Sequence, residues 1–262
     1  MIKLEHVVLA SPEQMEFIIE GMRNPMNSHD KSDSYMNYSV DFENKEDEII
    51  EVRYPYYKVG AADVALMQRL ANAGTDHRKF MRMMSVYVRI TAPLYWWKEF
   101  DTYRTGVTPN PMDIEINSCS TMHKIQEKGF TLEDFSCEHL NRIGTSTLWD
   151  IIDILNVARK LYLEGGEYKG EYYEAKDKRV WWQMIQLLPS SYNQTRNVMM
   201  NYEVLANIYK SRKNHKLDEW CVHETPEEYK FINKDFSSGM WGFCDWIETL
   251  PYSELICNKK ED

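Results

Sequence analysis

The sequence predicts a fold of mixed helix and strand, of the α/β or α+β class. The segment 2–9 alternates loosely and ends in three aliphatic residues, which is typical of a strand. A helix start follows directly, because Ser11 is a capping residue, Pro12 suits the first turn and Glu13 favours the helix N-terminus. The segment 218–256 is amphipathic in pieces, so the chain is expected to end in a helical part that packs on the rest.

The segments between these two ends continue the alternation. Gly74 is placed to end one helix and Gly165-Gly166 another, and Thr131-Leu132-Glu133-Asp134 reads as the start of a short helix. No internal repeat and no convincing linker divides the chain, so we expect a single domain over residues 1–262. Strands are expected over 49–57 and at the end of 81–90, and helices over 60–73, 145–163 and 173–188.

The polar segment from Arg23 to Ser34 has an Asn-Pro step and no hydrophobic periodicity. Two interpretations are open for it. It is either a solvated connector, the usual role of a polar loop, or a loop that faces a substrate with Arg23, Asn27, His29 and Lys31.

The composition excludes several classes of protein. Of the 262 residues, 43% are hydrophobic, so the chain can bury a core and is not expected to be disordered. Asp and Glu (41) outnumber Lys and Arg (31), and the net charge of -10 argues against general binding to nucleic acids. A local basic pocket for a nucleotide stays open.

The cysteines and the apolar runs predict the compartment. The five cysteines are scattered and form no CxxC pair, which indicates neither a disulfide framework nor a zinc site, so we expect no metal. The N-terminus is too short and too charged for a secretory signal, and no apolar run is long enough to span a bilayer. We therefore expect a cytoplasmic protein without a membrane partner.

The stretch from Asp76 to His123 combines the features of a binding site. A strand-like apolar segment ends at Ala92-Pro93, and an aromatic-rich helical segment follows it. A polar loop then leads to Asn117-Ser118-Cys119-Ser120. Strand, helix and loop form a frame for an anion site, in which the loop offers hydroxyls and backbone N–H groups as donors.

This layout resembles the flavin-dependent thymidylate synthases. In that family a strand ends in Ala-Pro, a helix closes on Arg-His-Arg, and an Asn-Glu-x-Ser loop follows. Here Thr102-Tyr103-Arg104 stands at the first motif and, after an insertion, Asn117-Ser118-Cys119-Ser120 stands at the second. The last Arg, the Asn and the final Ser are identities.

A second block of resemblance lies towards the C-terminus. The family has Leu-Pro at the end of a helix, a turn with Tyr, and then an Asn-rich helix that leads to an Arg. From Leu188-Pro189 without a gap, Asn201, Asn207 and Arg212 fall on family identities, and Asn201 and Arg212 are expected on turns of one helix. The two blocks cover residues 74–122 and 188–216.

The resemblance implies both a fold and a reaction. The fold would be thymidylate synthase-like, with a mixed sheet flanked by helices and a helical C-terminal part. The reaction would be the methylation of dUMP to dTMP by an FAD-dependent methyltransferase, with methylenetetrahydrofolate and NADPH as co-substrates. The family also implies a homotetramer whose sites are shared between subunits. The flavin would carry the hydride, while the protein orients and polarises the pyrimidine.

The resemblance further implies roles for individual residues. Arg212 and Ser120 are the catalytic candidates: Arg212 polarises the uracil ring, and Ser120 binds the phosphate with neighbouring N–H groups. A covalent role for Ser120 is disfavoured, because no base is visibly poised for it. Glu99, at a family Gln, would accept a hydrogen bond from the base or ribose. The flavin-binding positions are His77, Arg104, Asn201 and Asn207, and the nucleotide-binding positions are Glu99, Arg104, Ser118, Ser120 and Arg212.

The chain departs from the family at charged positions. Thr102, Met122 and Glu203 each stand where the family has an Arg, and Arg82 stands at an acidic position. A dianionic phosphate needs charge-assisted donors, so either other cations substitute or the ligand differs. The candidate substitutes are Arg78, Arg82, Lys124, Arg196 and Lys213.

Three alternatives stay open because of these departures. One is a non-catalytic relative that binds a flavin or a pyrimidine nucleotide, another is an enzyme for a different pyrimidine nucleotide, and the third is a helical interaction protein. Two local features also have a second explanation. Trp96, Trp97 and Phe100 either pack the core or subunits or stack on a flavin, and Asn201 is also explained as a cap.

Overall fold

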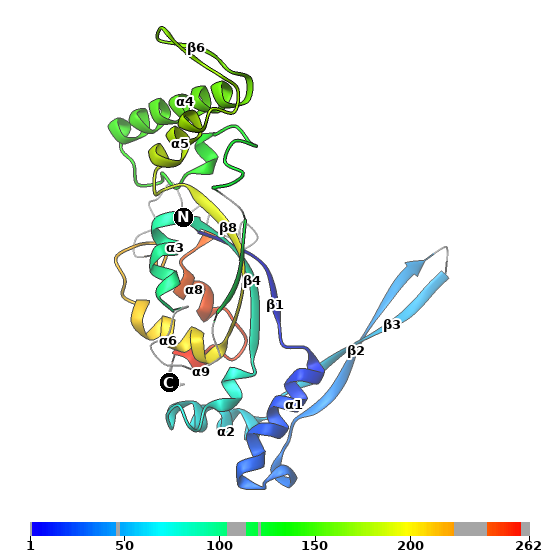
Figure 1. The fold of residues 1–262 in the computed structure, drawn as a ribbon. Helices are drawn as coiled ribbons and strands as arrows, with labels where there is room; N and C mark the ends of the chain where they lie inside the picture. Colours follow the sequence, from blue (N-terminus) through cyan, green and yellow to red (C-terminus); the bar gives the residue numbers. More distant parts are fainter. Residues whose placement is uncertain (1, 46–47, 104–113, 120–121, 223–239, 258–262) are drawn as a thin grey trace.

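The body of the protein is a five-stranded sheet with helices on one face (Figure 1). The computed structural model describes residues 2–45, 48–103, 114–119, 122–222 and 240–257. The strand order is β5-β8-β4-β1-β9, and every pair among the described residues is antiparallel, so the sheet itself is not of mixed direction. Its strands are β1 (Ile2–Leu9), β4 (Ser85–Pro93), β5 (Glu115–Ser118), β8 (Asn193–Asn201) and β9 (Met240–Trp241).

The helices confirm the expected α/β (α+β) class. Those of the body lie on one face of the sheet, where Figure 1 shows α3, α6 and α8, and no helix of the described residues covers the opposite face of β1, β4 and β8. The chain ends in short helices, as expected. The helices are α1 (Pro12–Arg23), α2 (Ala61–Asn72), α3 (Leu94–Phe100), α4 (Arg142–Glu164), α5 (Lys178–Leu187), α6 (Tyr202–Arg212), α8 (Phe243–Glu248) and α9 (Glu254–Cys257).

Alternation along β4 explains how the sheet forms two different faces. Val86, Val88 and Ile90 are buried against the helices, while Tyr87 and Arg89 between them are exposed. Successive side chains of a strand point to opposite faces, so an antiparallel sheet with one solvated face has this pattern. The β-branched residues on the buried face favour the strand over a helix.

An aromatic cluster fills the space between the sheet and its helices. Trp96 lies 4.9 Å from Phe100 and 4.8 Å from Trp220, measured between ring centroids. The rings of Trp96, Trp97, Phe100 and Phe243 are at most 1% exposed. They have no accessible face for a flavin, so their role is core packing.

Several predicted helix ends are confirmed. Ser11 accepts a hydrogen bond from the backbone N–H of Gln14, whose side chain bonds back to Ser11, and this forms the capping box of α1. Gly74 (φ +105°) follows α2 and Gly165 (φ +73°) caps α4. Both need the left-handed region that glycine adopts without strain. The predicted short helix is the 3-10 turn Leu132–Asp134.

Other elements differ from the prediction. The strand β2 (Tyr35–Lys45) was not predicted. The helix expected from residue 173 begins at Lys178, because a hairpin of β6 (Gly166–Tyr168) and β7 (Glu171–Tyr173) precedes it. Asn201 is not inside a helix. It is the last residue of β8 and the N-cap of α6, so the block after residue 189 is a strand before it becomes a helix.

The segment from Arg23 to Ser34 is held to α2 at both of its ends, while Asn27, His29 and Lys31 between them are exposed. The side chains of Arg23 and Asp63 are 5% and 0% exposed, and Nε of Arg23 lies 2.6 Å from Oδ1 of Asp63. The hydroxyls of Ser32 and Ser34 donate to Oδ2 of Asp63 at 2.7 and 2.6 Å. Burial works to raise the pKa of Asp63, but the bonds from Ser34, Ser32 and Arg23 outweigh it and hold that pKa below its ordinary value. Arg23 is therefore not available to a substrate.

Two parts extend from the body in Figure 1. Strands β2 and β3 (Glu48–Lys58) form an antiparallel hairpin that projects away from it. Helices α4 and α5 pack together at the other end of the molecule around a hydrophobic cluster of their own, which includes Leu148, Ile152, Leu155 and Met184. No helix in the described part of the chain is long and apolar enough to cross a membrane.

Candidate functional site

Arg212, the predicted nucleotide-binding residue, lies in an ion pair at the end of α6. Its Nη1 donates to Oε2 of Glu99 in α3 at 2.9 Å, and its Nε donates to the hydroxyl oxygen of Tyr103 at 2.7 Å. The side chain is 18% exposed. Nη2 has no hydrogen-bond partner among the described residues. Both N–H bonds of Nη2 are therefore left for a ligand.

Aromatic rings fix the orientation of this guanidinium. Its central carbon lies 4.9 Å from the ring centroid of Trp220 and 5.5 Å from that of Tyr103. The indole nitrogen of Trp220 also donates to Oε2 of Glu99, at 3.0 Å. Ring and carboxylate together hold Arg212 in one position before any ligand arrives, which is the preorganisation that a binding residue needs.

His215 is the third donor that faces Glu99. Its Nε2 lies 3.4 Å from Oε2 of Glu99, and its Nδ1 accepts a hydrogen bond from the backbone N–H of Leu217 at 3.2 Å. Because Nδ1 accepts, the proton of the neutral ring sits on Nε2 and points at the carboxylate. Oε2 of Glu99 is thus occupied by protein donors, and only its other oxygen is left for a base or a ribose.

The charge of this cluster limits what it can bind. The carboxylate of Glu99 balances the guanidinium of Arg212, so the two together carry no net charge. A dianionic phosphate needs unbalanced cations, whereas a neutral carbonyl needs only a directed donor. The cluster around Arg212 is therefore suited to the carbonyl edge of a polar ring.

A second charged cluster lies at the other end of α6, around Glu203. Arg78 Nε lies 3.0 Å from Oε1 of Glu203, and Arg82 Nε bonds its other oxygen. Arg82 also donates from Nη2 to the carbonyl oxygen of Thr75 at 3.2 Å. The hydrogen bond with Glu203 raises the pKa of Arg82 above its ordinary value. Two guanidiniums share the carboxylate of Glu203, and the negative charge of Asp76 also acts on Arg82.

This cluster explains two departures from the family together. Glu203 stands where the family has an Arg, and Arg82 stands where it has an acid. In this chain the two side chains are bonded to each other, and all of the cluster's side chains are at most 21% exposed. Two positions at which the resemblance implies a departure in charge are thus joined by an ion pair in this structure.

The other candidate cations are engaged in ion pairs or stand apart. Arg196 Nη1 lies 2.8 Å from Oδ1 of Asp101, and Lys124 pairs with Glu127. Lys213 is exposed and lies over the ring of Tyr209. Four of the five candidates thus hold a carboxylate, which weakens the case that they bind a phosphate.

The three described flavin candidates lie at or near the Glu203 cluster. Asn201 is 6% exposed, and its Oδ1 accepts from the backbone N–H of Val204 at 3.0 Å, so it is a helix cap. Asn207 is exposed, and its Oδ1 accepts from Nη2 of Arg78 at 3.4 Å. His77 is exposed and directly precedes Arg78. Asn207 and His77 are thus accessible to a cofactor, while Asn201 has a structural task.

The two clusters lie on different faces of α6. A residue of an α-helix advances about 100° around the axis, so Arg212 is rotated about 140° from Asn207. Arg212 shares its face with Leu205 and Ile208, which are buried against the body. Within one copy of the chain, the predicted flavin residues and Arg212 therefore do not converge on one point.

The loop candidates lie at the end of β5. Ser118 is exposed and stands opposite Arg196 of β8 in the strand register, and Cys119 follows it. Arg104 and Ser120 lie outside the described residues. A hollow of about 320 Å³ adjoins this end, and its lysines are compensated, Lys128 by Asp134 at 2.8 Å. It is lined by residues that include Cys119, Lys124, Tyr192, Asn193 and Thr195.

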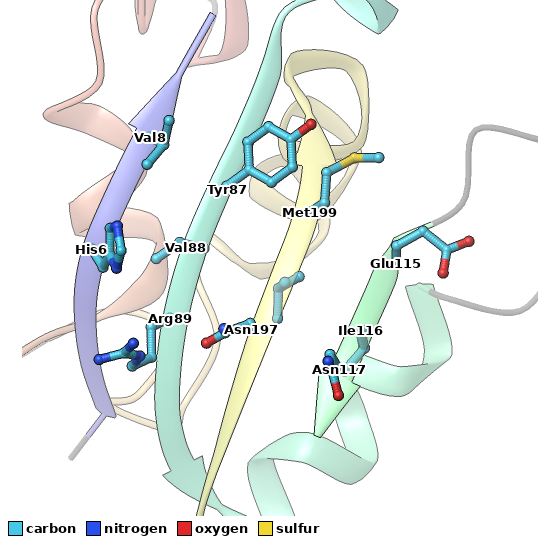
Figure 2. Close-up of a pocket in the computed structure, with 11 residues that line it drawn as sticks. His6, Val8, Tyr87, Val88, Arg89, Glu115, Ile116, Asn117, Asn197 and Met199 are labelled. Atoms are coloured by element: carbon cyan, nitrogen blue, oxygen red, sulfur yellow. The ribbon is translucent and has the colours of Figure 1, made fainter. Parts of the chain in front are cut away.

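A shallow hollow of about 350 Å³ lies on the uncovered face of the sheet (Figure 2). Its side chains stand in two rows across the strands. Val8, Tyr87 and Met199 are register partners and form an apolar row, and Arg89 and Asn197 begin a polar row beside it. Of the predicted site motifs, only Asn117 of the loop reaches this hollow.

The sequence did not single out two residues that build the Arg212 cluster. Trp220 belongs to the C-terminal part that was read only as a packing element, and nothing in its local spacing points to Glu99. Tyr103 carried a signal, since it stands at the His of the Arg-His-Arg motif. Both act through the orientation of Arg212, which only the fold reveals.

Solved structures with the same fold are found, although no family model matches the sequence and no curated protein matches it. The thymidylate synthase X of Helicobacter pylori with FAD and dUMP has a TM-score of 0.52 at 13% identity, over 98% of this chain and 95% of that one. A UMP/dUMP methylase, PolB, of Streptomyces cacaoi, bound with 5-Br dUMP, has a TM-score of 0.50 at 12% identity, over 97% and 93%.

These likenesses span nearly the whole length of each chain, so they concern the complete fold and not one motif. At 12–13% identity they establish the fold alone. The chain has the fold of the flavin-dependent thymidylate synthases, with a free-standing hairpin and two charged clusters arranged along α6.

Proposed function

We propose that this chain is a flavin-dependent methyltransferase that methylates dUMP to dTMP. Methylenetetrahydrofolate would donate the carbon and NADPH the electrons. The observation that carries the proposal is the state of Arg212 at the end of α6. Its guanidinium is held by Glu99 and two aromatic rings, and one N–H edge has no partner among the described residues.

The Arg212 cluster would bind the pyrimidine. The free Nη2 edge of Arg212 donates to a ring carbonyl and draws electron density from the ring. Tyr103 and Glu99 keep that edge in place, and Ser118 and Ser120 of the loop would bind the nucleotide beside it. In this assignment the ion pair of Arg212 and Glu99, which has no net charge, binds the pyrimidine ring. Other groups must then bind the phosphate.

The residues around Glu203 fit an FAD cofactor. The cluster brings the two guanidiniums of Arg78 and Arg82 together, which can donate to a diphosphate, and the exposed side chains of Asn207 and His77 lie at or next to it. Arg104 is proposed at the junction of flavin and nucleotide. When bound, the flavin would supply hydride transfer, and these side chains would hold and orient it.

The proposal includes the assembly and the compartment. Since the two clusters lie on different faces of α6, one copy of the chain does not bring the predicted residues together. A homotetramer whose sites take residues from more than one copy would do so. The whole chain is proposed to fold as one domain and to work in the reducing cytoplasm.

One observation favours an alternative ligand. Four of the five candidate phosphate-binding cations hold carboxylates, and the Glu99–Arg212 pair is neutral. The chain would then be an enzyme for a pyrimidine nucleotide other than dUMP, or a non-catalytic relative. Binding of deoxyuridine as tightly as dUMP would show that the phosphate is not recognised and would favour the non-catalytic relative. Turnover of a cytosine or modified nucleotide would favour the other enzyme.

The decisive experiment is the visible absorbance of the purified protein, titrated with FAD and then with dUMP. A bound-flavin spectrum that dUMP shifts supports the proposal and justifies an assay of dTMP formation. The absence of flavin binding at saturating FAD contradicts it.

A variant of Arg212 tests the nucleotide assignment. Arg212→Lys keeps the charge that pairs with Glu99 but lacks the second N–H edge, so affinity for dUMP should fall by at least about tenfold, as expected for a lost charge-assisted bond. FAD affinity and thermal stability should change little. Arg142→Lys, at an exposed position of α4, is the matched control. Unchanged dUMP affinity of Arg212→Lys would remove Arg212 from the site.

A further inference from the structure

Tyr103 presents a hydrogen-bond donor beside the Nη2 edge of Arg212. Nε of Arg212 donates to the hydroxyl oxygen of Tyr103 at 2.7 Å. A guanidinium has no acceptor, so Tyr103 is the acceptor in this bond and its own O–H proton points elsewhere. No residue in the described part of the chain accepts that proton. The hydroxyl is therefore a second donor that a ligand can use, beside the N–H bonds of Nη2.

The shape of the guanidinium brings these two donors together. Nε and Nη2 form one edge of a rigid planar fork, and their N–H bonds along that edge are parallel. Because Tyr103 occupies the Nε position, an oxygen bound at the Nη2 position lies directly beside the hydroxyl oxygen. Two oxygens held by one edge are within reach of an O–H···O bond, whose usual length is about 2.7 Å. The ligand oxygen, the hydroxyl and the guanidinium then close a ring of three hydrogen bonds.

The ligand atom that fits this position is a neutral carbonyl oxygen. A carbonyl oxygen has two lone pairs, so it accepts one bond from Nη2 and one from the hydroxyl. An anionic oxygen is disfavoured, because Oε2 of Glu99 lies 2.9 Å from Nη1 of the same guanidinium and balances its charge. The side chain of Arg212 is 18% exposed, so water competes less for these bonds than at an open surface.

The surroundings make Tyr103 a strong and preorganised donor. The bond that it accepts comes from a charged group, and hydrogen bonds in a chain polarise one another. The ring is also held in place. Its centroid lies 5.5 Å from the central carbon of the guanidinium and 6.3 Å from the ring centroid of Trp220. The hydroxyl is thus positioned before a substrate arrives.

We propose that Tyr103, in addition to orienting Arg212, is a catalytic residue whose hydroxyl donates with Nη2 to the carbonyl oxygen at carbon 4 of the pyrimidine. The inference rests on the proposed function. The double bond between carbons 5 and 6 of uracil is conjugated with this carbonyl, so attack at carbon 6 moves negative charge onto its oxygen. Two preorganised donors aimed at that oxygen stabilise the charge as it develops. The hydroxyl donates a hydrogen bond and keeps its proton.

Tyr103→Phe tests this role, because it removes the hydroxyl and leaves the ring. In assays of dTMP formation with the FAD-loaded protein, kcat should fall by about 10²-fold or more, the usual loss for one such donor. The dissociation constant for dUMP should rise by less than about tenfold, because the bond is strongest in the transition state. A hydroxyl that only orients Arg212 predicts the reverse, with weaker dUMP binding and kcat retained at saturating dUMP. That result overturns the proposal.

Tyr209→Phe is the matched control. Tyr209 lies on α6, as Arg212 does, and its hydroxyl donates to Oε1 of Glu248 at 2.6 Å, outside the Arg212 cluster. This variant loses a hydrogen bond of the same kind, so its thermal stability should fall while kcat and dUMP affinity keep the parental values. If kcat falls equally in Tyr209→Phe and Tyr103→Phe, the effect comes from lost stability and the proposal is overturned.

Infrared difference spectroscopy of bound dUMP, isotopically labelled at carbon 4, gives a readout that needs no turnover. The carbonyl stretch should lie at lower wavenumber in the parent complex than in the Tyr103→Phe complex, since two donors polarise the carbonyl more than one. Identical stretches overturn the proposal. Titration of the parent with FAD and dUMP separates the two levels of inference. A parent that binds neither ligand contradicts the proposed function as well, whereas a parent that forms dTMP with the same kcat as Tyr103→Phe contradicts only the role of Tyr103.

Discussion

Glu203 holds two arginines, and this arrangement has consequences that are measurable at the level of single residues. Glu203→Arg places three guanidiniums together, and Arg82→Glu places two carboxylates together, in a cluster that is at most 21% exposed. Each reversal should lower the free energy of unfolding by about 1–3 kcal/mol, and the double variant should regain most of the loss. Urea unfolding of the four proteins gives the coupling energy.

The exposed pair of Arg53 and Glu51 is the matched control for this cycle. Its nitrogen and oxygen are 2.7 Å apart, but the side chains are 68% and 45% exposed. Solvent screening reduces such a pair to at most about 1 kcal/mol, so the same swap should give a coupling near zero. Equal coupling in the two cycles would mean that the Glu203 cluster is only a surface ion pair.

The lowered pKa of Asp63 predicts how the free energy of unfolding depends on pH. Its pKa in the folded state is held below the ordinary 3.8, so its stabilisation is present above that value and is lost as pH falls through the folded pKa. Ser34→Ala removes one bond to the carboxylate and should cost about 1–3 kcal/mol at pH 7. The difference from the parent should shrink as pH falls through the folded-state pKa of Asp63, because protonation removes the charge that the hydroxyl stabilises.

Urea unfolding at pH 7 and at pH 2.5 measures this difference. Ser39→Ala is the control, because the hydroxyl of Ser39 donates to the backbone carbonyl oxygen of Tyr54 in the exposed hairpin of β2 and β3, and this bond involves no titrating group. A Ser34→Ala deficit that is the same at both pH values would show that the hydroxyl acts on the backbone and not on the charge of Asp63.

At the scale of the element, the start of α6 allows the capping role of Asn201 to be told apart from a flavin-binding role. Asn201 caps this helix through its side-chain oxygen. Asn201→Ala should therefore cost about 1 kcal/mol of stability, while Asn201→Asp, which keeps the capping oxygen, should cost little. If the amide nitrogen of Asn201 also binds the flavin, Asn201→Asp will weaken FAD binding at unchanged stability. Equal FAD affinity for parent and Asn201→Asp leaves Asn201 as a cap alone.

The same region shows what the sequence predicts about an element and what it does not. The strand β4 is predictable, because Val86, Val88 and Ile90 alternate with exposed residues. β8 is not, since its outward positions are polar except for Met199, and only Val198 and Met200 mark the buried face at its end. A central strand of a sheet with one solvated face has few apolar residues to reveal it. Local pattern therefore fails where the neighbouring strands decide the structure.

The candidate site was predictable in its residues and not in its arrangement. The spacing after residue 189 selects Asn207 and Arg212, and both lie on α6 as expected. Their separation around the helix follows only once the helix is known to begin at Tyr202. The partners of Arg212 come from α3 and from Trp220, which are more than 100 positions apart in sequence, and no local rule connects them.

At the scale of the whole molecule, the two hydrophobic clusters are joined by a short segment. The backbone of 190–192 bonds to the start of α3 through Leu94 at 3.0 Å and Tyr95 at 3.1 Å. It also bonds to the α4–α5 part, through Ser136 at 2.8 Å and the bridge between Phe135 and Tyr192. One segment thus belongs to both clusters, which favours the proposed single domain over two independent ones.

Calorimetry of matched core variants tests this cooperativity. Ile90→Val removes a methyl group from the sheet cluster, and Ile152→Val removes one from the α4–α5 cluster; both side chains are at most 2% exposed. Each should cost about 0.5–1.5 kcal/mol. In a single cooperative unit both variants lower the midpoint of the same transition by similar amounts, and the calorimetric enthalpy equals the van't Hoff enthalpy. If the trace resolves into two transitions and each variant moves only one, the segment 190–192 is a connection between two domains. The proposed flavin and nucleotide clusters would then belong entirely to the sheet domain, because α3 and α6 both pack there.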